Sequence, residues 1–433
     1  MGKATTADLS SDNKHEQKLQ AVLLADSFMT TFRPISLDKS TPKVLCPLNN
    51  VAMLDYSIEF LAGSGVEELF VFCATGGDAV EAYVEKSDWT SSIKVRCVKD
   101  SSVTNAGDAL RALDKLGLIV SDPFILMHGD VVTNTDITPV LREHKDRRKK
   151  DSSAIMTVLF KQVGTWQAKG TLLTTPRASG AVTINSKHNH HHKNNIITSA
   201  QSFSVSSLRS LNDDLVVALA DSSSSSSNKE SCGSARRILL YDSNPWSSTV
   251  SLPLSFFEAH AHIQIHNDLS DTGIYICSPD VLARFSDEFD YLFVSKFISN
   301  SVAEEESGLQ NKIFAHVLKS HEYAARIHDP RTYHAVSKDL LRRWAFPVVP
   351  DNLPSGYEKI YRYAMEGRMV YRERKKGGTK IARSTIIEGP SMIGSGCSIG
   401  EFCLIQVRIS LITIFDVTCI LDNNMPLLFA PTL

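Results

Sequence analysis

The residues best placed for phosphate chemistry lie in segment 25–34, directly after the apolar run Gln20–Ala25. A turn between a strand and a helix can cradle nucleotide phosphates when glycines let backbone N–H groups approach, usually with help from a basic side chain. This segment contains no glycine. Asp26 would repel a phosphate, and Phe28 and Met29 would crowd its approach. The segment therefore argues against nucleotide chemistry at this loop.

Two other polar clusters offer weaker chemistry. His188 and the run His190–His192 have no carboxylate or cysteine at useful spacing, and six serines follow at Ser222–Ser227. Such composition is typical of a disordered insertion, here about 185–236, and not of a metal site. The basic run Arg142–Lys150 interleaves acidic residues and has no aromatics, which indicates a solvated helix end and not a nucleic-acid site.

The elements that must position such a loop alternate between strand and helix. Apolar runs predict strands at Gln20–Ala25, Leu69–Cys73, Ile93–Val98, Pro123–Met127 and Ala154–Phe160. Helical spacing falls between them at Met53–Leu61, Ala79–Lys86, Ala106–Leu116 and Ile137–Arg148. This alternation predicts an α/β fold with a mainly parallel, Rossmann-like sheet. A ligand site would then lie at the carboxyl ends of the strands.

In the second half of this domain, the segments that predict strands and helices are shorter. Strands are expected at His260–His266, Gly273–Cys277 and Lys312–Leu318, with helices at Asp280–Phe285 and Thr332–Trp344. A polar stretch precedes the first strand, and three prolines follow the last helix. We therefore expect a disordered N-terminus at 1–18, an α/β domain at 19–346 and a linker at 347–379.

A strict period of six marks the next segment. Isoleucine recurs at Ile381, Ile387, Ile393, Ile399 and Ile405, with glycines at the turns between. Each hexad of a hexapeptide β-helix supplies one short face with its aliphatic residue inward, so these isoleucines are the expected core of a partial left-handed β-helix at 380–406. The repeat decays in an atypical tail at 407–433. One open coil exposes an edge, so we expect either a covering partner or a truncated product.

Composition narrows the class of protein. The 433 residues are 42% apolar, and 46 Lys and Arg against 48 Asp and Glu give a net charge of −2. This balance excludes a generally basic nucleic-acid binder. No apolar run reaches the roughly 18 residues of a membrane span, and the polar N-terminus carries no secretory signal. Eight cysteines without CxxC pairs are typical of reduced thiols. We expect a cytosolic protein that binds neither membrane nor nucleic acid.

Several segments carry a family resemblance. The run LLADSFMTTFRPISLDKSTPKVLCPLNNVAMLDYSIEFLAGSGVEELFVFC resembles the nucleotidyltransferase-like domain of the epsilon-type subunits of translation initiation factor 2B. The segments FILMHGDVVTN, DTGIYICSPDVLARFSDEFDYLFVSKF and LLRRWAFPVVP support it, as do the hexads. The resemblance implies a nucleotidyltransferase-type fold in a subunit of the guanine-nucleotide exchange factor for initiation factor 2.

The wider family of sugar-nucleotide pyrophosphorylases has a glycine-rich loop that this chain alters. Thr30, Arg33 and Pro34 match its pattern, whereas other positions do not. The resemblance thus marks a degenerate nucleotide loop at Asp26, Ser27, Met29, Thr30, Thr31 and Arg33. Asp130 fits the family's magnesium position, but a carboxylate after a strand is more often a cap, and Lys43 is expected to pack or stay solvated. We expect no cofactor, no metal and no catalytic residue.

The resemblance also implies a partner surface. In this family an Asn-Phe-Asp motif touches the gamma subunit of initiation factor 2, and here the corresponding residues are Glu288, Phe289 and Asp290. The amide of the family motif is replaced by an acceptor-only carboxylate, which would weaken or alter the contact. Alternatively, Phe289 and Tyr291 are core residues at a helix corner. Both interpretations stay open at this point.

We therefore expect a binding and assembly subunit that is not an enzyme. It would join sister subunits, a gamma-type one first, and bind initiation factor 2, while the family's C-terminal exchange domain is missing from this chain. The alternative is a sugar-1-phosphate nucleotidyltransferase in which Asp130 holds Mg²⁺. A hexapeptide-repeat acyltransferase is disfavoured because no histidine lies between Ile381 and Gln406.

Overall fold

The structure is a computed structural model, and it describes most of the α/β domain and part of the hexad segment. The described residues are 18–26, 28, 31–33, 35–36, 42–87, 89, 93–163, 181–185, 197–198, 215–220, 235–243, 262–304, 311–353, 357–359, 370–373, 380–388, 391–393 and 398–406. The expected disordered N-terminus (except Lys18) and the atypical tail lie outside these residues. Within the described part, no helix is both long and apolar enough to cross a membrane.

A parallel sheet forms the N-terminal half, as the sequence predicts. The strands β1 (Gln20–Leu24), β4 (Glu68–Cys73), β5 (Lys94–Lys99) and β6 (Phe124–His128) pair in parallel in the order β6-β1-β4-β5. Every residue of β1 is buried. Such a strand carries an uninterrupted apolar run because helices cover both of its faces.

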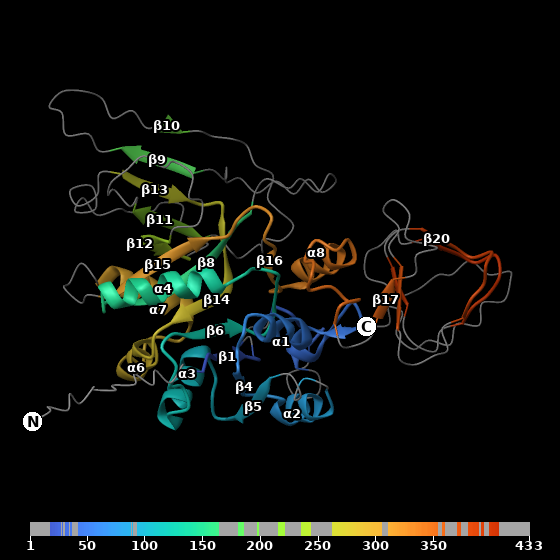
Figure 1. The fold of residues 1–433 in the computed structure, drawn as a ribbon, viewed down its shortest axis with the longest axis horizontal. Coiled ribbons are helices and arrows are strands. Elements are labelled where there is room, and N and C mark those ends of the chain that lie inside the picture. Colours follow the sequence, from blue (N-terminus) through green and yellow to red (C-terminus); the bar gives the residue numbers. More distant parts are fainter. Residues whose placement is uncertain are drawn as a thin grey trace, which may run out of the picture.

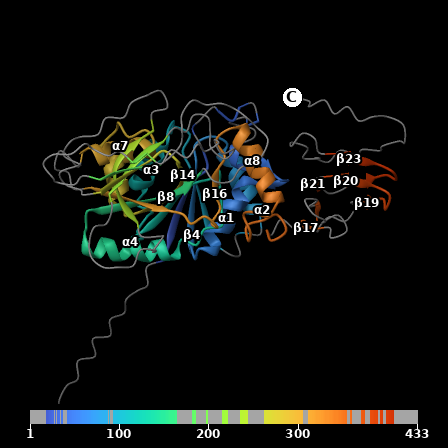
Figure 2. The ribbon, with the colours of Figure 1, turned by 90° about the horizontal axis from the view of Figure 1, so that it is seen from above.

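Helices cover the sheet on both faces (Figures 1 and 2). On one face, α1 (Met53–Gly63), α2 (Gly77–Lys86) and α4 (Thr138–Lys150) pack into a core with alternate residues of β1, β4 and β6. On the other face, α3 (Ala106–Leu116), α6 (Asp280–Asp287) and α7 (Val294–Glu304) pack with the remaining residues of these strands. The helix α7 is not among the helices that the sequence predicts.

The second half of the sheet is mostly antiparallel, which the strand–helix alternation of the first half does not predict. β14 (Leu269–Cys277) runs antiparallel between β6 and β8 (Ala154–Gln162). β15 (Lys312–Val317) pairs in parallel with β8. Beyond β15 the order continues through β12 (Arg236–Asp242), β11 (Val216–Ala220), β13 (His262–His266), β9 (Ala181–Asn185) and β10 (Ile197–Thr198), all antiparallel.

One strand corrects the expected disordered insertion at about 185–236. β11 lies inside that range, and its residues Val217, Ala218 and Leu219 are fully buried. Its five residues, VVALA, are apolar enough to join the core although the flanking chain is polar. The His and Ser runs themselves lie outside the described residues.

Small elements close one end of the parallel sheet. They are the 3-10 helix η1 (Lys43–Leu45), β2 (Pro47–Leu48), β3 (Val51–Ala52), β7 (Val131–Thr133), β16 (Ala324–Arg326) and α8 (Pro330–Leu341). A third core gathers Phe32, Tyr56 and Tyr333 among these elements, and Met392 of the hexad segment packs into it. The hexad segment is thus joined to the α/β domain by apolar contact.

The hexad segment pairs as stacked coils. Its strands are β19 (Lys380–Ile381), β20 (Ile386–Glu388), β21 (Ser391–Ile393), β22 (Ser398–Ile399) and β23 (Leu404–Gln406). Ile381 pairs in parallel with Ile399, and Ile387 with Ile405, so each coil spans three hexads.

Burial agrees with an inward row of isoleucines. Ile387, Ile393 and Ile399 are buried, and Ile381 is half-buried. The predicted β-helix start is confirmed, and its left hand stays a prediction. Part of the expected linker at 347–379 also joins it, because β18 (Val370–Glu373) pairs with β21 and with β17 (Tyr357–Lys359). This segment has no isoleucine hexad to reveal it in the sequence.

A buried carboxyl group in α8 makes the fold sensitive to pH. Asp339 is 7% exposed, and its Oδ2 accepts a hydrogen bond of 3.2 Å from the Tyr323 hydroxyl. Burial raises the pKa of Asp339 to about 6, although the Tyr323 hydrogen bond opposes the shift. A carboxyl whose folded pKa exceeds its unfolded value favours the folded state below the unfolded pKa, and this contribution is lost as the pH rises through the folded one.

We predict that Asp339→Asn stabilises the chain at pH 8, because a neutral amide avoids the cost of a buried charge. The rise of the pKa from an unfolded value near 3.9 to about 6 corresponds to roughly 3 kcal/mol at high pH. Urea unfolding should show an advantage that shrinks by about 1–2 kcal/mol between pH 8 and pH 5. The control is Asp287→Asn, at an exposed position. An advantage that does not change with pH would contradict this account.

Candidate functional site

Asp130 lies where the sequence predicts a ligand site, at the carboxyl end of β6. It follows His128 and Gly129, and it is 3% exposed. The Gly129 N–H donates to the Leu24 carbonyl at the end of β1 over 2.8 Å. A Cβ at Gly129 would come within 2.8 Å of Val44 Cγ1, so the turn packs too tightly for a side chain there. The strand ends therefore fix the position of the carboxylate.

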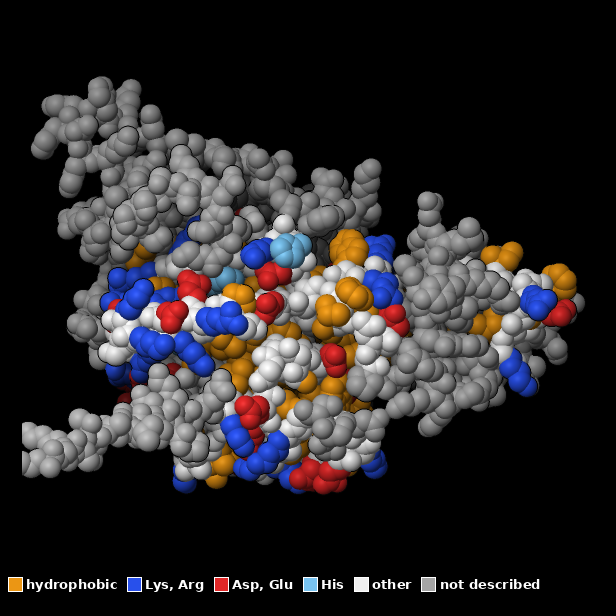
Figure 3. All heavy atoms as spheres, viewed as in Figure 1, with side chains coloured by type: hydrophobic (Ala, Val, Ile, Leu, Met, Phe, Trp, Pro, Cys, Tyr) orange, Lys and Arg blue, Asp and Glu red, His pale blue; other side chains and the backbone are white. Residues whose placement is uncertain are grey.

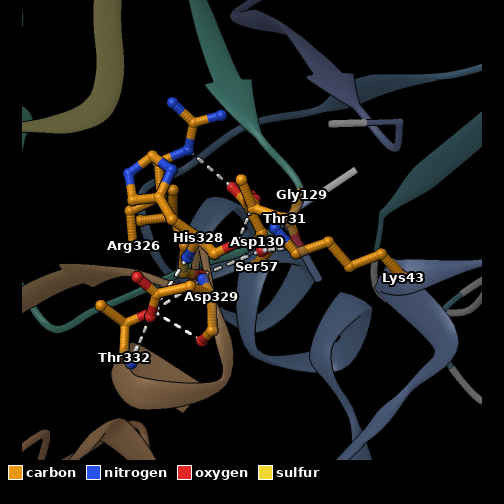
Figure 4. A network of polar contacts seen from close by, with 10 residues as sticks. Thr31, Lys43, Ser57, Gly129, Asp130, Arg326, His328, Asp329 and Thr332 are labelled. Carbon is orange, nitrogen blue, oxygen red and sulfur yellow. Dashed lines mark hydrogen bonds and ion pairs between the residues drawn. The ribbon is translucent and has the colours of Figure 1, made fainter. Parts of the chain in front are cut away.

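Two cations, the buried Lys43 and the largely buried Arg326, hold the Asp130 carboxylate (Figure 4). Lys43 Nζ, from η1, lies 2.6 Å from Oδ2, and Arg326 Nε, from β16, donates to Oδ1 over 2.9 Å. The Lys43 and Arg326 side chains are 7% and 13% exposed. We call Lys43, Asp130 and Arg326 the ion-pair centre. Asp130 is therefore not the simple cap that we expected, whereas Lys43 packs, which is one of its two expected alternatives, and it does so in an ion pair.

The charges of the ion-pair centre are strongly coupled. Burial alone would raise the pKa of Asp130, but Arg326 and Lys43 outweigh it and hold that pKa well below its usual range. Burial lowers the pKa of Lys43, although Asp130 opposes the shift. Burial also lowers the pKa of His128, with Arg326 adding to the effect. The Asp130 carboxylate thus stays ionised, because its attraction to two nearby cations outweighs the cost of removing it from water.

Further hydrogen bonds tie the ion-pair centre to its surroundings. The Ile327 N–H donates to the Asp130 carbonyl over 2.9 Å, and the Thr31 hydroxyl donates to the His328 carbonyl over 2.8 Å. Asp329 then begins α8 with a capping box closed by Thr332. The segment after β1, the β6–β7 turn and α8 therefore form one connected polar network (Figure 4).

This donor set does not suit a magnesium ion. A divalent cation needs several free oxygen ligands, whereas each Asp130 oxygen here faces a buried cation. Among the described residues, no group of three or more His, Cys, Asp and Glu side chains is arranged to hold a metal. We therefore assign Asp130 the role of joining β6 to η1 and β16.

The altered nucleotide loop is partly described. Asp26 Oδ2 accepts from the N–H groups of Ala74 and, over 3.1 Å, Thr75, so it caps the loop between β4 and α2. Thr31 bonds the His328 carbonyl, and Arg33 is exposed. Ser27, Met29 and Thr30 lie outside the described residues. Asp26 therefore has a structural partner at the strand ends, which its sequence position did not reveal.

The loop after α6 contains the expected partner motif, for which the sequence left two interpretations open: an exposed contact surface or core residues. Glu288, Phe289 and Asp290 are exposed, and Phe289 is 73% exposed. Tyr291 is 2% exposed, and its ring lies edge-on to those of Phe285 and Phe297. The core reading thus holds for Tyr291 only. Phe289 is available to a partner.

Comparison with known proteins identifies relatives of the chain. The nucleotidyl transferase family model matches residues 20–166. Over 383 residues the chain is 35% identical to translation initiation factor eIF2B subunit epsilon of Dictyostelium discoideum, covering 88% of this chain and 45% of that protein. It is 32% identical to the same subunit of Schizosaccharomyces pombe, covering 90% of this chain and 48% of that protein. These matches confirm the resemblance seen in the sequence, and the chain spans about half the length of these relatives.

A more distant relative bears on catalysis. Over 141 residues the chain is 26% identical to mannose-1-phosphate guanylyltransferase 1 of Arabidopsis thaliana, covering 32% of this chain and 38% of that protein. This match and the nucleotidyl transferase family model contradict the expectation that the chain is not an enzyme. That expectation gave weight to the missing glycines of one loop, whereas the family match extends over the whole N-terminal part of the domain.

The ion-pair centre yields a prediction about stability. Asp130→Asn keeps the size of the side chain but leaves Lys43 and Arg326 buried without their counter-charge. Breaking a buried pair in this way should lower the free energy of unfolding by about 3–5 kcal/mol, measured in urea at pH 7. The control Asp78→Asn removes a carboxylate that is 96% exposed and pairs with Lys99, so it should leave the free energy of unfolding nearly unchanged. Equal losses for the two variants would contradict the role assigned to Asp130.

Proposed function

Starting from the similarity to translation initiation factor eIF2B subunit epsilon, we propose that this chain is a subunit of the guanine-nucleotide exchange factor for initiation factor 2. It acts in translation initiation in the cytosol. Its contribution is to assemble with sister subunits and to bind initiation factor 2. Both tasks depend on complementary surfaces, so they require exposed side chains at fixed positions.

The exposed Phe289 is the observation that carries this proposal. Phe289 is 73% exposed, so a partner that buried its ring would remove a large apolar surface from water and gain binding free energy. The motif matched by resemblance therefore lies where a partner can reach it. Binding of initiation factor 2 at this loop, which contains Glu288, Phe289 and Asp290, explains why the ring is left in water.

The hexad segment supplies a second surface, for assembly. In the described residues, β19 pairs with β22 and β20 with β23, and Ile386 and Phe402 are 52% and 80% exposed. Exposed apolar side chains beside short strand edges are suited to contact with a similar coil. We propose that a sister subunit covers this surface, and a gamma-type subunit is the first candidate.

Nucleotidyl transfer is the second candidate function, favoured by the family match over residues 20–166. Its assay is release of pyrophosphate from a nucleoside triphosphate and a sugar 1-phosphate. The ion-pair centre does not suit a magnesium ion, so we assign no metal-assisted step to it. Pyrophosphate release that Asp130→Ala abolishes while the variant stays folded would make nucleotidyl transfer an activity of this chain.

The proposed function predicts that Phe289→Ala weakens binding of purified initiation factor 2 by tenfold or more. A buried aromatic anchor is typically worth about 2 kcal/mol at an interface, and 1.4 kcal/mol corresponds to tenfold. The matched control is Phe346→Ala, because Phe346 is 54% exposed and lies 5.3 Å from the Arg343 guanidinium, the distance that also separates Phe289 from Arg111.

Two measurements complete this test. Both variants should melt at the wild-type temperature and should co-purify with a gamma-type sister subunit as the wild type does. A wild-type chain that binds neither initiation factor 2 nor a sister subunit would refute the proposed function. Unchanged factor binding by Phe289→Ala would refute the role of the loop.

A further inference from the structure

The exposed loop is docked on the first turn of α3 by backbone contacts. The Gly107 N–H donates to the Leu292 carbonyl over 2.9 Å. A Cβ built at Gly107 would lie 1.8 Å from the Tyr291 carbonyl oxygen, which no side chain can tolerate. Glycine at this position therefore allows the loop backbone to approach the helix.

Arg111 lies one turn further along α3 and binds the same loop. The two hydrogens of its NH1 are shared among the carbonyls of Phe285, Glu288 and Tyr291, which lie 3.1, 3.4 and 3.4 Å away, and its NH2 donates to the Phe289 carbonyl over 3.3 Å. One guanidinium thus contacts four backbone carbonyls that lie in a single bend of the chain. Because the guanidinium is planar and has five donors, it can do this where a lysine could not.

The same guanidinium supports the Phe289 ring. Its central carbon lies 5.3 Å from the ring centroid, within the range of a cation–π contact. Asp108 Oδ1 in turn accepts from Arg111 NH2 over 3.0 Å, and the Arg111 side chain is 12% exposed. The Arg111 guanidinium therefore packs against the Phe289 ring, while most of the surface of the ring remains exposed to solvent.

The loop displays more than the motif. Leu292 and Phe293 are 46% and 43% exposed, which gives three large apolar side chains within five residues. The exposed acidic residues Asp287, Glu288 and Asp290 accompany them. A surface of this kind fits a partner face with an apolar pocket and a basic rim.

We propose that Gly107 and Arg111 are positioning residues that hold the Phe289 loop in its binding conformation. The inference rests on the proposed function, because initiation factor 2 is taken as the partner. A loop that is ordered before binding loses less conformational entropy when it docks, so its order raises affinity. Neither residue needs to touch the partner itself.

The first test uses the full chain with Arg111→Ala and Arg111→Lys. We expect Arg111→Ala to weaken binding of purified initiation factor 2 by about tenfold, and Arg111→Lys to restore only a small part of the loss, since lysine keeps the charge but not the four carbonyl contacts. The matched control is Arg96→Ala, because Arg96 also pairs with a carboxylate and lies 5.9 Å from a ring centroid, but on the edge strand β5. The control should bind as the wild type does.

A double variant separates positioning from general stability. If Arg111 acts through the Phe289 ring, Arg111→Ala combined with Phe289→Ala should bind no more than about twofold more weakly than Phe289→Ala alone. Full addition of the two losses would overturn the proposal. Wild-type affinity in Arg111→Ala would overturn it as well.

Hydrogen exchange keeps this inference distinct from the proposed function. In Arg111→Ala, the amides of residues 288–293 should exchange at least tenfold faster, while those of β1 and β4 should not change. If the wild-type chain fails to bind initiation factor 2, the proposed function fails, and this exchange still decides whether Arg111 orders the loop. Unchanged exchange would contradict the positioning role whatever the binding result.

Gly107→Ala gives an independent check through the backbone. The added methyl group must displace the Tyr291 carbonyl, so we expect the same faster exchange in residues 288–293 and a loss of affinity similar to that of Arg111→Ala. The control is Gly63→Ala at the end of α1, where a Cβ would meet nothing within 4 Å. If Gly107→Ala behaves like Gly63→Ala, the proposal is wrong.

Discussion

The ion-pair centre is the interaction on which the closed end of the sheet depends. One buried carboxylate, Asp130, joins η1 through Lys43 and β16 through Arg326, and these three segments are far apart in the sequence. Desolvating three charges is costly, so the arrangement holds only while each charge keeps its partner. The strand ends, the segment after β1 and α8 all take their positions from this network.

This constraint separates two regions of the molecule. At the strand ends the polar groups bond one another, as Asp26 does with Ala74 and Thr75. On the face covered by α3, α6 and α7, the loop after α6 instead leaves Phe289 and its acidic neighbours exposed. On the face that Figure 3 presents, basic, acidic and apolar side chains are interspersed among the described residues. We therefore propose that the partner binds at the loop after α6, and that the ion-pair centre stabilises the fold.

The sequence predicts the parts of this fold that local periodicity determines. Apolar runs and helical spacing identify β1, β4 and α3, and the isoleucine hexads identify the stacked coils, since each signal lies within a few residues. The partners of Asp130 were missed because Lys43 and Arg326 are 87 and 196 positions away. β11 was missed because five apolar residues stand in a polar stretch. The order of the Phe289 loop was not foreseen because its carbonyl contacts with Arg111 join residues 174 to 180 positions apart in the sequence.

Whether initiation factor 2 binds the Phe289 loop and not the strand ends is measured most directly by its hydrogen-exchange footprint on the whole chain. We expect protection in residues 285–293 and in the first turn of α3, whereas segment 25–36 and the β6–β7 turn should exchange as in the free chain. Protection confined to the strand ends around Asp130, with the Phe289 loop unchanged, would contradict this expectation.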